Sequence, residues 1–298
     1  MKVLVLGASG FIGFPAAQAL VRAGHFVYGL TRSQEKAKIL AGEEIIPIVG
    51  EIGNPDAWVD IVKDLDVVID AVGGTADVKQ LSHTTLAAVS AKAKASRPDH
   101  APKLTYIYTS GTWVHGDNRN DVVTDSTPLR GPPELVSWRP AQEQRTIHDP
   151  VLNGIVIRPA LLYGRGGSLL APLFKGASEG RVAWPGTPGG RYALIHTDDL
   201  ADMYVRACEK APIVGGVIFD ACNEFTESAD DVLAALVKVS GAKGQYEYTK
   251  PSNLYEVALS TTSLIRPYLA RTLLGWQPSK PGLVDGLPMY YAAWKALQ

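Results

Sequence analysis

Short apolar runs alternate with helix-like stretches through the first half of the chain. The runs are rich in β-branched and aromatic residues and are bounded by Gly, Asp or Pro, a pattern typical of strands. We predict these strands at residues 3–6, 26–30, 45–49, 67–69 and 104–108. The stretches between them predict helices near residues 11–23, 34–41, 55–64 and 76–96.

The predicted strands are apolar along their length and do not alternate between apolar and polar residues. Such runs suit parallel strands that are covered by helices on both faces. The repetition of strand and helix predicts right-handed crossovers, and a sixth strand follows at residues 155–157. The expected fold class is therefore α/β, a doubly wound parallel sheet with a smaller C-terminal substrate-binding portion.

The residue composition of the chain changes after Pro159. Residues 163–191 are rich in glycine and hold three prolines, which suits loops that could close over a ligand. Beyond them the pattern predicts strands near 193–196, 216–220 and 245–249 and helices near 198–210, 227–239 and 282–296. We expect a first domain over 1–160 and a substrate-binding portion over 161–298, interleaved through a return segment near 193–222.

A glycine-rich turn joins the first predicted strand to the first predicted helix. Gly7, Gly10 and Gly13 form a G-x-x-G-x-x-G pattern in the strand-to-helix context that a dinucleotide-binding turn requires. Gly7 permits the tight turn, Gly10 lets the backbone approach a pyrophosphate, and Gly13 allows helix and strand to pack closely. The helix N-terminus adds N–H donors and a partial positive charge. The alternative is a glycine-rich turn that binds nothing.

The end of the second strand indicates which dinucleotide would bind. An acidic residue there would accept hydrogen bonds from the ribose 2′-hydroxyl of NAD, but the chain has Arg32 and Ser33. Arg32 can pair with a 2′-phosphate and Ser33 can donate to it, so we predict NADP(H). The alternative is a solvated arginine at a helix start. Glu51 and Asp70 end other strands, and we interpret both as capping or loop residues.

Composition and charge narrow the function classes. The chain has 29 Lys and Arg against 30 Asp and Glu, so it lacks a basic excess and we expect no nucleic-acid partner. Cys208 and Cys222 are too few for a disulfide framework or a four-cysteine zinc site. No apolar run reaches the roughly 18 residues of a membrane span, and the N-terminus lacks a signal-peptide pattern. We expect a cytoplasmic protein with a small-molecule substrate, no membrane partner, and a homodimer as one possible assembly.

Several further segments occur in an order typical of one enzyme superfamily. They lie at residues 7–13, 108–116, 157–164, 195–201 and 274–278. With them, nearly the whole chain resembles the extended branch of the short-chain dehydrogenase/reductase superfamily, the NAD(P)-dependent epimerases, dehydratases and reductases. The resemblance implies a Rossmann domain followed by a smaller substrate domain. Besides the three glycines, Arg32 and Ser33, it implies cofactor contacts from Ser9, Phe11, Ile12, Ile52, Ala71, Val72, Gly73, Thr109 and Pro159.

The proton chemistry of the superfamily is not matched. There, a Tyr hydroxyl exchanges a proton with the substrate oxygen, a Lys lowers the Tyr pKa and holds the ribose, and a Ser or Thr orients the carbonyl. Here the Tyr-x-x-x-Lys pair is replaced by Trp138 and Gln142 in one register, or by Arg139 and Glu143 in the next. Trp138 offers only an N–H donor that does not ionise in the useful range. The chain therefore resembles the atypical members.

Three residues could replace that chemistry. Thr112, beside the Gly111 that takes the Ser or Thr position, could polarise a carbonyl. Histidine is a common general acid in enzymes, so His115 could take that role, while Arg139 could supply positive charge for an oxyanion or a phosphate. In the alternative interpretations, Thr112 caps the fifth strand, His115 packs where the superfamily has a tyrosine, and Arg139 pairs with Glu143 along one helix face.

Four residues in or next to the glycine-rich segment are candidate substrate contacts. Tyr163 should lie near the mouth of the pocket. Trp184 and Tyr192 would suit an aromatic pocket wall or a lid that shields the site from solvent. By resemblance, Arg191 matches an arginine that contacts the phosphate of nucleotide sugars.

His196, Asp198 and Asp199 lie close together in the sequence, as the ligands of a metal site can. The two carboxylates are better explained as the N-terminal residues of the next helix, where they accept hydrogen bonds from N–H groups. We therefore expect no metal.

The predicted function is that of an NADP(H)-dependent oxidoreductase, which transfers hydride to or from a small organic carbonyl, alcohol or imine. Epimerisation or dehydration of a sugar-like substrate is the enzymatic alternative, although it needs stronger acid–base help. A non-catalytic NADP(H)-binding regulatory protein is the other alternative, since the cofactor turn is retained while the catalytic residues are replaced.

Overall fold

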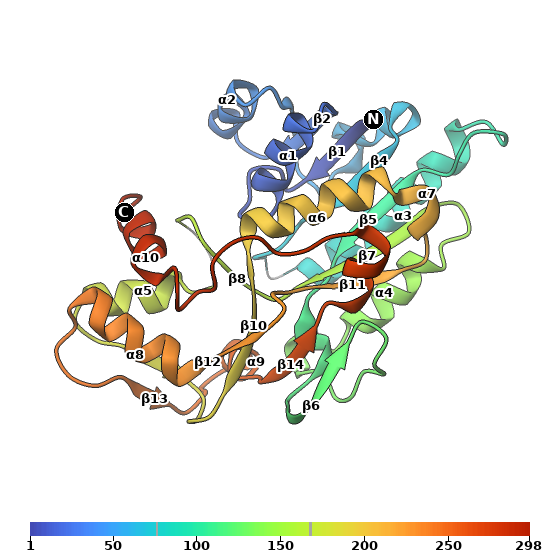
Figure 1. Cartoon of the computed structure of the whole chain (residues 1–298). Helices are drawn as coiled ribbons and strands as arrows, with labels where there is room; N and C mark the ends of the chain where they lie inside the picture. The colour runs from blue at the N-terminus through green and yellow to red at the C-terminus, as the bar shows by residue number, and fades with distance from the viewer. Residues whose placement is uncertain (76, 167–168) are drawn as a thin grey trace. The chain divides into compact units, whose positions relative to one another are not determined.

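The computed structural model describes residues 1–75, 77–166 and 169–298. Residue 76, where the fourth predicted helix was expected to begin, and residues 167–168 of the glycine-rich segment lie outside the described residues. The chain forms two compact units (Figure 1). Unit 1 comprises Met1–Ser110, Trp138–Arg158 and Leu200–Phe219, and unit 2 comprises Gly111–Ser137, Pro159–Asp199 and Asp220–Gln298.

A seven-stranded parallel sheet confirms the expected α/β fold class. Its order is β11-β7-β5-β4-β1-β2-β3, so the strand sequence reverses between β1 and β4. The strands are β1 (Lys2–Leu6), β2 (Phe26–Thr31), β3 (Ile46–Val49), β4 (Val67–Asp70), β5 (Thr105–Thr109), β7 (Asn153–Pro159) and β11 (Ile218–Ala221). Because β3 is an edge strand, its residues are largely exposed and do not share the two-sided burial of β1 and β4.

Helices connect these strands. They are α1 (Gly13–Arg22), α2 (Gln34–Gly42), α3 (Val78–Ser96), α4 (Arg139–Ile147), α6 (Thr197–Glu209) and α7 (Ala211–Val214). The helix predicted over 55–64 is instead two 3₁₀ helices, η1 (Pro55–Ala57) and η2 (Val59–Asp64). Trp58 separates them with a non-helical backbone, and its buried side chain joins the core of unit 1.

Alternate strand residues build this core. Leu4, Leu6, Tyr106 and Tyr108 point to one face of the sheet and pack in one hydrophobic cluster with Leu86 of α3. The carboxyl ends of the parallel strands meet at one edge, where open α/β sheets bind their ligands. The fold therefore brings the residues that follow β1, β2, β4 and β5 to a common edge.

Unit 2 is built from small sheets and short helices. Its sheets are β8 (Leu161–Tyr163), β10 (Arg191–His196) and β12 (Thr226–Ser228); β9 (Ala183–Pro185) with β13 (Glu247–Thr249); and β6 (Asn118–Thr124) with β14 (Ser263–Arg266). Its helices include α5 (Ala171–Ser178), α8 (Ala229–Ser240), α9 (Leu254–Leu259), α10 (Leu287–Lys295), the 3₁₀ helices η3 (Thr112–His115) and η4 (Glu134–Val136), and the π-helical turn Ala270–Leu274.

The glycine-rich segment contains a helix, α5, where the sequence predicted loops. Leu170, Leu173, Phe174 and Ala177 recur at helical spacing, and they bury the apolar face of α5 in the core of unit 2. Among the described residues, no helix has the length and apolar character needed to span a bilayer.

Candidate active site

The turn between β1 and α1 can hold only glycine at two of its three glycine positions. Gly7 has a φ of 77°, and a Cβ there would lie 2.9 Å from the carbonyl oxygen of Ala71. A Cβ at Gly13 would overlap the Gly7 carbonyl oxygen. Gly10 donates its N–H to that same oxygen at 2.9 Å, which closes the turn. The glycines at 7 and 13 are therefore required by the backbone itself.

A cleft of about 420 Å³ opens beside this turn in unit 1. Eight of the predicted cofactor residues line it, namely Gly7, Ser9, Gly10, Arg32, Ile52, Ala71, Val72 and Gly73. Phe11, Ile12, Gly13, Ser33 and Thr109 of the same unit are not part of the lining, and Pro159 belongs to unit 2. Ile12 is the N-cap of α1, and within the described residues no side chain caps this helix. The N-terminus of α1 can therefore receive an anion.

Two cationic side chains lie where β2 ends and α2 begins. Arg32 and Lys36 are exposed, and both line the cleft. Ser33, which was predicted to donate to a phosphate, is the N-cap of α2, and its Oγ accepts a hydrogen bond from the Lys36 N–H at 3.3 Å. Sequence reasoning missed Lys36, although a lysine three residues after a capping serine lies in the first turn of the helix. Two acidic residues, Glu51 and Asp77, line the cleft as well.

Arg139 is held at the carboxyl end of β5. Its Nη1 donates to the Tyr108 hydroxyl at 2.9 Å and to the Thr109 carbonyl at 3.1 Å. The guanidinium carbon also lies 4.8 Å from the centre of the Trp138 ring, within cation–π range. The alternative in which Arg139 pairs with Glu143 is therefore wrong, because β5 offers the guanidinium closer partners.

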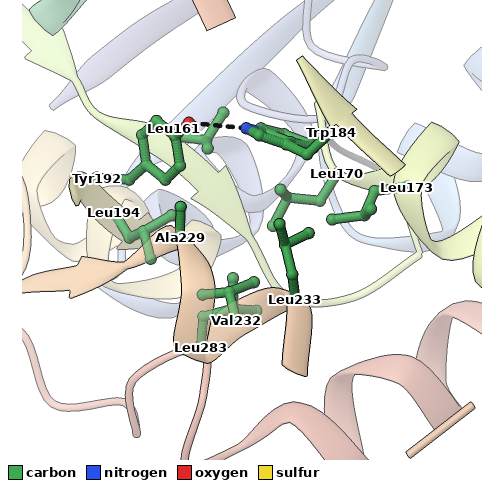
Figure 2. A pocket seen from close by; sticks show the side chains of 10 residues that line it. All are labelled: Leu161, Leu170, Leu173, Trp184, Tyr192, Leu194, Ala229, Val232, Leu233 and Leu283. Atoms are coloured by element: carbon green, nitrogen blue, oxygen red, sulfur yellow. Dashed lines mark hydrogen bonds between the residues drawn. The ribbon is translucent and has the colours of Figure 1, made fainter. Parts of the chain in front are cut away.

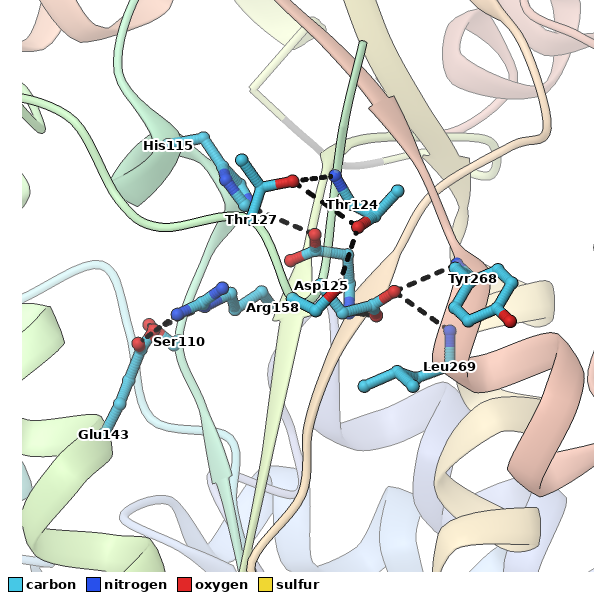
Figure 3. A network of polar contacts seen from close by, with 11 residues as sticks. Ser110, His115, Thr124, Asp125, Thr127, Glu143, Arg158, Tyr268 and Leu269 are labelled. Atoms are coloured by element: carbon cyan, nitrogen blue, oxygen red, sulfur yellow. Dashed lines mark hydrogen bonds and ion pairs between the residues drawn. The ribbon is translucent and has the colours of Figure 1, made fainter.

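Glu143 belongs to a buried network that Figure 3 shows. Its carboxylate accepts from Arg158 Nη2 at 2.6 Å and Nε at 2.9 Å, and from the Ser110 hydroxyl at 2.5 Å. Gln142 is also buried and donates to the Ser82 carbonyl of α3. Glu143 connects α4 to the sheet and Gln142 connects α4 to α3, so neither is available to stand in for the missing lysine.

The geometry favours a third register for the lost pair. Arg139 is the α4 cation that faces the end of β5, so it is the better substitute for the lysine of Tyr-x-x-x-Lys. The residue four positions earlier is then Leu135, which is partly exposed and has no ionisable group. In this register Arg139 keeps the positive charge of the lysine, and Leu135 replaces the tyrosine.

Burial shifts the pKa of two further groups at this sheet edge. Asp70, at the end of β4, accepts from the Tyr106 hydroxyl at 3.0 Å and from the Val72 N–H at 3.2 Å. Desolvation nonetheless raises the Asp70 pKa to about 6. Desolvation also raises the Tyr108 pKa to about 12, although the Arg139 charge opposes it. Asp70 caps the turn at Val72, as the sequence suggested.

Thr112 and His115 lie in η3 of unit 2, and both are buried. His115 Nε2 lies 2.8 Å from Asp220 Oδ2, and the two side chains are 1% and 0% exposed. Asp220 in turn donates its N–H to Asp125 Oδ1, while Asp125 Oδ2 accepts from the N–H groups of Tyr268 and Leu269 (Figure 3). Burial, followed by repulsion from Asp220, raises the Asp125 pKa. The His115 imidazole is thus part of a buried polar network.

Trp184 and Tyr192 do not form the expected aromatic pocket. Trp184 Nε1 donates to the Tyr192 hydroxyl at 2.8 Å, and both rings are buried among leucine, valine and alanine side chains (Figure 2). The space between these residues is about 10 Å³, too small for a ligand. Their indole and phenol groups satisfy each other, which allows both rings to serve as core.

Tyr163 and Arg191 are likewise hydrogen-bonded to other residues of unit 2. The buried Tyr163 hydroxyl donates to the Pro281 carbonyl at 2.8 Å and accepts from Asn223 Nδ2 at 3.1 Å. Arg191 donates from Nη2 to the Thr226 carbonyl at 2.6 Å and from Nε to its hydroxyl at 3.2 Å. The sequence did not reveal these hydrogen bonds, because Pro281 and Asn223 lie far along the chain from Tyr163, and Thr226 lies far from Arg191.

The segment with His196 and the two aspartates does not assemble a metal site. His196 Nδ1 accepts from the Asp198 N–H at 3.1 Å, and the Asp198 carboxylate pairs with Arg165. Asp199 accepts from Ser279 and from the Lys280 N–H, which fastens a C-terminal segment to this helix start. Within the described part of the chain, no cluster of His, Cys, Asp or Glu could hold a metal ion.

Comparison with known proteins gives a family match over part of the chain and a similar fold over nearly all of it. Residues 3–128 match the NAD dependent epimerase/dehydratase family. The chain is 23% identical to the ceramide reductase of Caulobacter vibrioides, over 96% of the chain and 89% of that protein. It is 26% identical to the UDP-glucose 4-epimerase of Mycolicibacterium smegmatis, over 96% of each. The dTDP-glucose 4,6-dehydratase of Bacillus anthracis, solved with NAD, shares the fold with a TM-score of 0.82 and 16% identity, over 99% of the chain and 97% of that structure.

Proposed function

We propose that this chain, a member of the NAD-dependent epimerase/dehydratase family as its motifs predicted, is an NADP(H)-dependent oxidoreductase. Its substrate would be an organic carbonyl, alcohol or imine, to or from which hydride is transferred. Named relatives include both a reductase and an epimerase, so the choice between these reactions depends on the residues of the chain itself.

The observation that carries the proposal is the cleft beside the glycine turn. Gly10 presents its backbone there, and a side chain at this position would occupy the space of a pyrophosphate. The uncapped start of α1 supplies N–H donors for that anion. Arg32 and Lys36 provide two positive charges for a 2′-phosphate, and the end of β2 has no carboxylate for a 2′-hydroxyl. The residues present therefore fit NADP(H).

The bound nicotinamide would supply the hydride chemistry, and the chain would supply charge and orientation. Arg139 is fixed by two hydrogen bonds and keeps its charge at any working pH, so it can stabilise negative charge that develops on a substrate oxygen. It cannot donate a proton in a catalytic cycle, so the proton comes from water in our proposal. Thr112 would help to polarise the carbonyl.

Loss of the tyrosine favours simple reduction over epimerisation or dehydration. Epimerisation through a keto form needs a proton removed and then returned, and each transfer benefits from a poised acid or base by roughly 10²–10⁴-fold. Leu135 provides neither. A ketone reduction needs only one proton, which solvent can deliver after the hydride.

The test is a substrate panel with the purified chain. We expect NADPH oxidation, followed at 340 nm, with at least one class of ketone, aldehyde or imine, and NADP⁺ reduction with the matching alcohol or amine. Tight NADPH binding with no turnover in either direction would support the regulatory alternative. Conversion of a nucleotide sugar with no net change in the cofactor would support the epimerase alternative.

A further inference from the structure

Four partly exposed apolar side chains lie on two helices of unit 2 that pack against each other. They are Leu135 of η4 and Leu254, Tyr255 and Val257 of α9, and they are 37–45% exposed. Single exposed apolar residues are normal on a protein surface, but a group on adjoining elements marks a binding surface. We refer to these four residues as the apolar strip.

The apolar strip adjoins a cavity of about 370 Å³, within the range of ligand pockets. Val257 belongs to both, and Pro133, which also lines the cavity, directly precedes η4. Pro251 lines the cavity just before α9 begins. The apolar strip therefore meets the cavity at Val257.

Each polar side chain that lines this cavity makes at least one hydrogen bond within unit 2. The Asp117 carboxylate accepts from the Thr262 N–H at 2.7 Å. Arg119 donates to the Pro188 carbonyl and to the Thr187 hydroxyl oxygen at 3.3 and 3.0 Å. The Ser260 and Thr261 hydroxyls both donate to the Val257 carbonyl.

A sugar or a phosphate in this cavity would have to compete with these internal hydrogen bonds. An uncharged apolar group would leave them intact and would gain from removing Val257 and the prolines from water. The lining thus favours an apolar occupant over a nucleotide sugar.

One further contact connects this surface to a candidate catalytic residue. The Trp113 ring meets the Tyr255 ring edge-on, with 6.3 Å between the centroids. Trp113 directly follows Thr112 in η3. Tyr255 of the apolar strip therefore contacts the residue that directly follows Thr112 in the chain, the residue that we propose polarises the substrate carbonyl.

We propose that the substrate is a carbonyl compound with an uncharged alkyl chain, which lies along the apolar strip and enters the 370 Å³ cavity. This inference rests on the proposed oxidoreductase function and names the substrate class of that site.

The test compares 2-butanone with 2-nonanone as substrates and as ligands. Burial of one methylene is worth about fourfold, so we expect kcat/KM for the longer ketone to be higher by at least about 50-fold, the gain from three buried methylenes. Calorimetric titration of the chain alone with each ketone provides a readout that needs neither the cofactor nor turnover. The longer ketone should bind more tightly by a similar factor.

Two variants test whether the preference for the longer ketone arises at Val257. Val257→Asp puts a charge in the cavity and should lower kcat/KM for 2-nonanone far more than for 2-butanone, which removes most of the preference for the longer ketone. Val257→Thr, close in shape, should reduce the preference less and guards against misfolding. Ile213→Asp is the matched control, since Ile213 is an exposed apolar residue that lines none of the cavities described here.

The outcomes separate this inference from the function on which it rests. Equal binding and equal kcat/KM for the two ketones would overturn the alkyl-chain assignment and leave hydride transfer standing. A preference that survives Val257→Asp would place the alkyl chain elsewhere and also overturn it. Chain-length-dependent binding without any turnover would support the apolar site and contradict the oxidoreductase proposal.

Discussion

At the scale of residues, the arginines carry the proposed chemistry. Arg32 reaches the cleft from the end of β2, and Arg139 is fixed at the end of β5 by the Tyr108 hydroxyl and the Thr109 carbonyl. A guanidinium keeps its charge and orients several donors, so it can replace a phosphate ligand or a lysine but not a proton-donating tyrosine.

Removing the cations at the end of β2 should change the cofactor preference. Arg32→Ala should weaken NADPH binding by about 1.5–3 kcal/mol, the range for hydrogen bonds to charged groups, and leave NADH nearly unchanged. Lys36→Ala should act in the same direction. Titrations by fluorescence or calorimetry measure this, with Arg22→Ala of α1 as the control because Arg22 lies outside the cleft lining. Equal affinity of the unmutated chain for both cofactors would contradict the assignment.

Replacing Arg139 should slow turnover without weakening the adenosine contacts. Arg139→Gln should lower kcat/KM by roughly 10²–10³-fold, as loss of one oxyanion donor does, and Arg139→Lys should lower it less. Tyr108→Phe should have a smaller effect because it removes only one of two anchors. Arg145→Gln, an exposed arginine of the same helix, is the control. Unchanged kinetics in Arg139→Gln would remove Arg139 from the mechanism.

The buried Asp70 carboxyl should make stability depend on pH. Its pKa is raised from 3.8 to about 6, so the folded chain holds this proton up to a higher pH than the unfolded chain does. Its contribution to stability is therefore complete below about pH 4 and is lost as the pH rises through about 6. Relative to Asp70→Asn, the unmutated chain should lose up to about 3 kcal/mol of unfolding free energy over this range. Urea titrations between pH 4 and 7 measure it, and parallel curves would refute the shift.

At the scale of elements, the glycines of the turn from β1 into α1 have two different roles, one in ligand binding and one in folding. Gly7 and Gly13 are required by backbone geometry, whereas a Cβ at Gly10 would come no closer than 3.1 Å to the Gly7 carbonyl oxygen. The same short motif thus contains two positions that shape the turn and one that faces a ligand.

Substitutions in this turn should therefore differ in kind. Gly10→Val should abolish dinucleotide binding with little change in Tm, because the branched side chain takes the space of the pyrophosphate. Gly13→Ala should lower Tm, because its methyl group overlaps the Gly7 carbonyl oxygen. Thermal unfolding with and without NADPH measures both effects. A strong Tm loss in Gly10→Val with binding retained would reverse the two roles.

At the scale of the whole molecule, neither unit is a continuous segment. Unit 1 ends with Leu200–Phe219, which contributes most of α6 and the start of the edge strand β11. Tyr204 of α6 is fully buried and is hydrogen-bonded to Thr109 of β5 at 2.6 Å. These elements lie in the return segment expected near residues 193–222, so residues 1–160 alone do not make up unit 1.

A fragment that ends at residue 160 should fail to fold. It lacks Met203, Tyr204 and Ala207, which are buried in the structure, and it would expose the apolar surface that they cover. We expect no cooperative unfolding by circular dichroism and no NADPH binding, while the full chain shows both. A fragment that unfolds cooperatively and binds NADPH would show that residues 1–160 form an independent domain.

Features that depend on neighbours along the chain were determined by the sequence alone. The strands and the glycine turn follow from local backbone preferences and from apolar periodicity, which act over a few residues, and Arg32 was identified by its position after the second strand. The short pairing of β6 with β14 was not predicted, because β6 is mostly polar and its partner lies far along the chain.

Only the tertiary structure decided which side chains are available for chemistry. Arg139 could have paired with Glu143, but Arg158 and Ser110 occupy that carboxylate, and Tyr108 and Thr109 take the guanidinium. Trp184 and Tyr192 have the composition of a pocket wall, yet they satisfy each other inside a core. In each case the decisive partner or neighbour is remote in sequence, and the free energy of a buried polar group depends on which partner the fold brings to it.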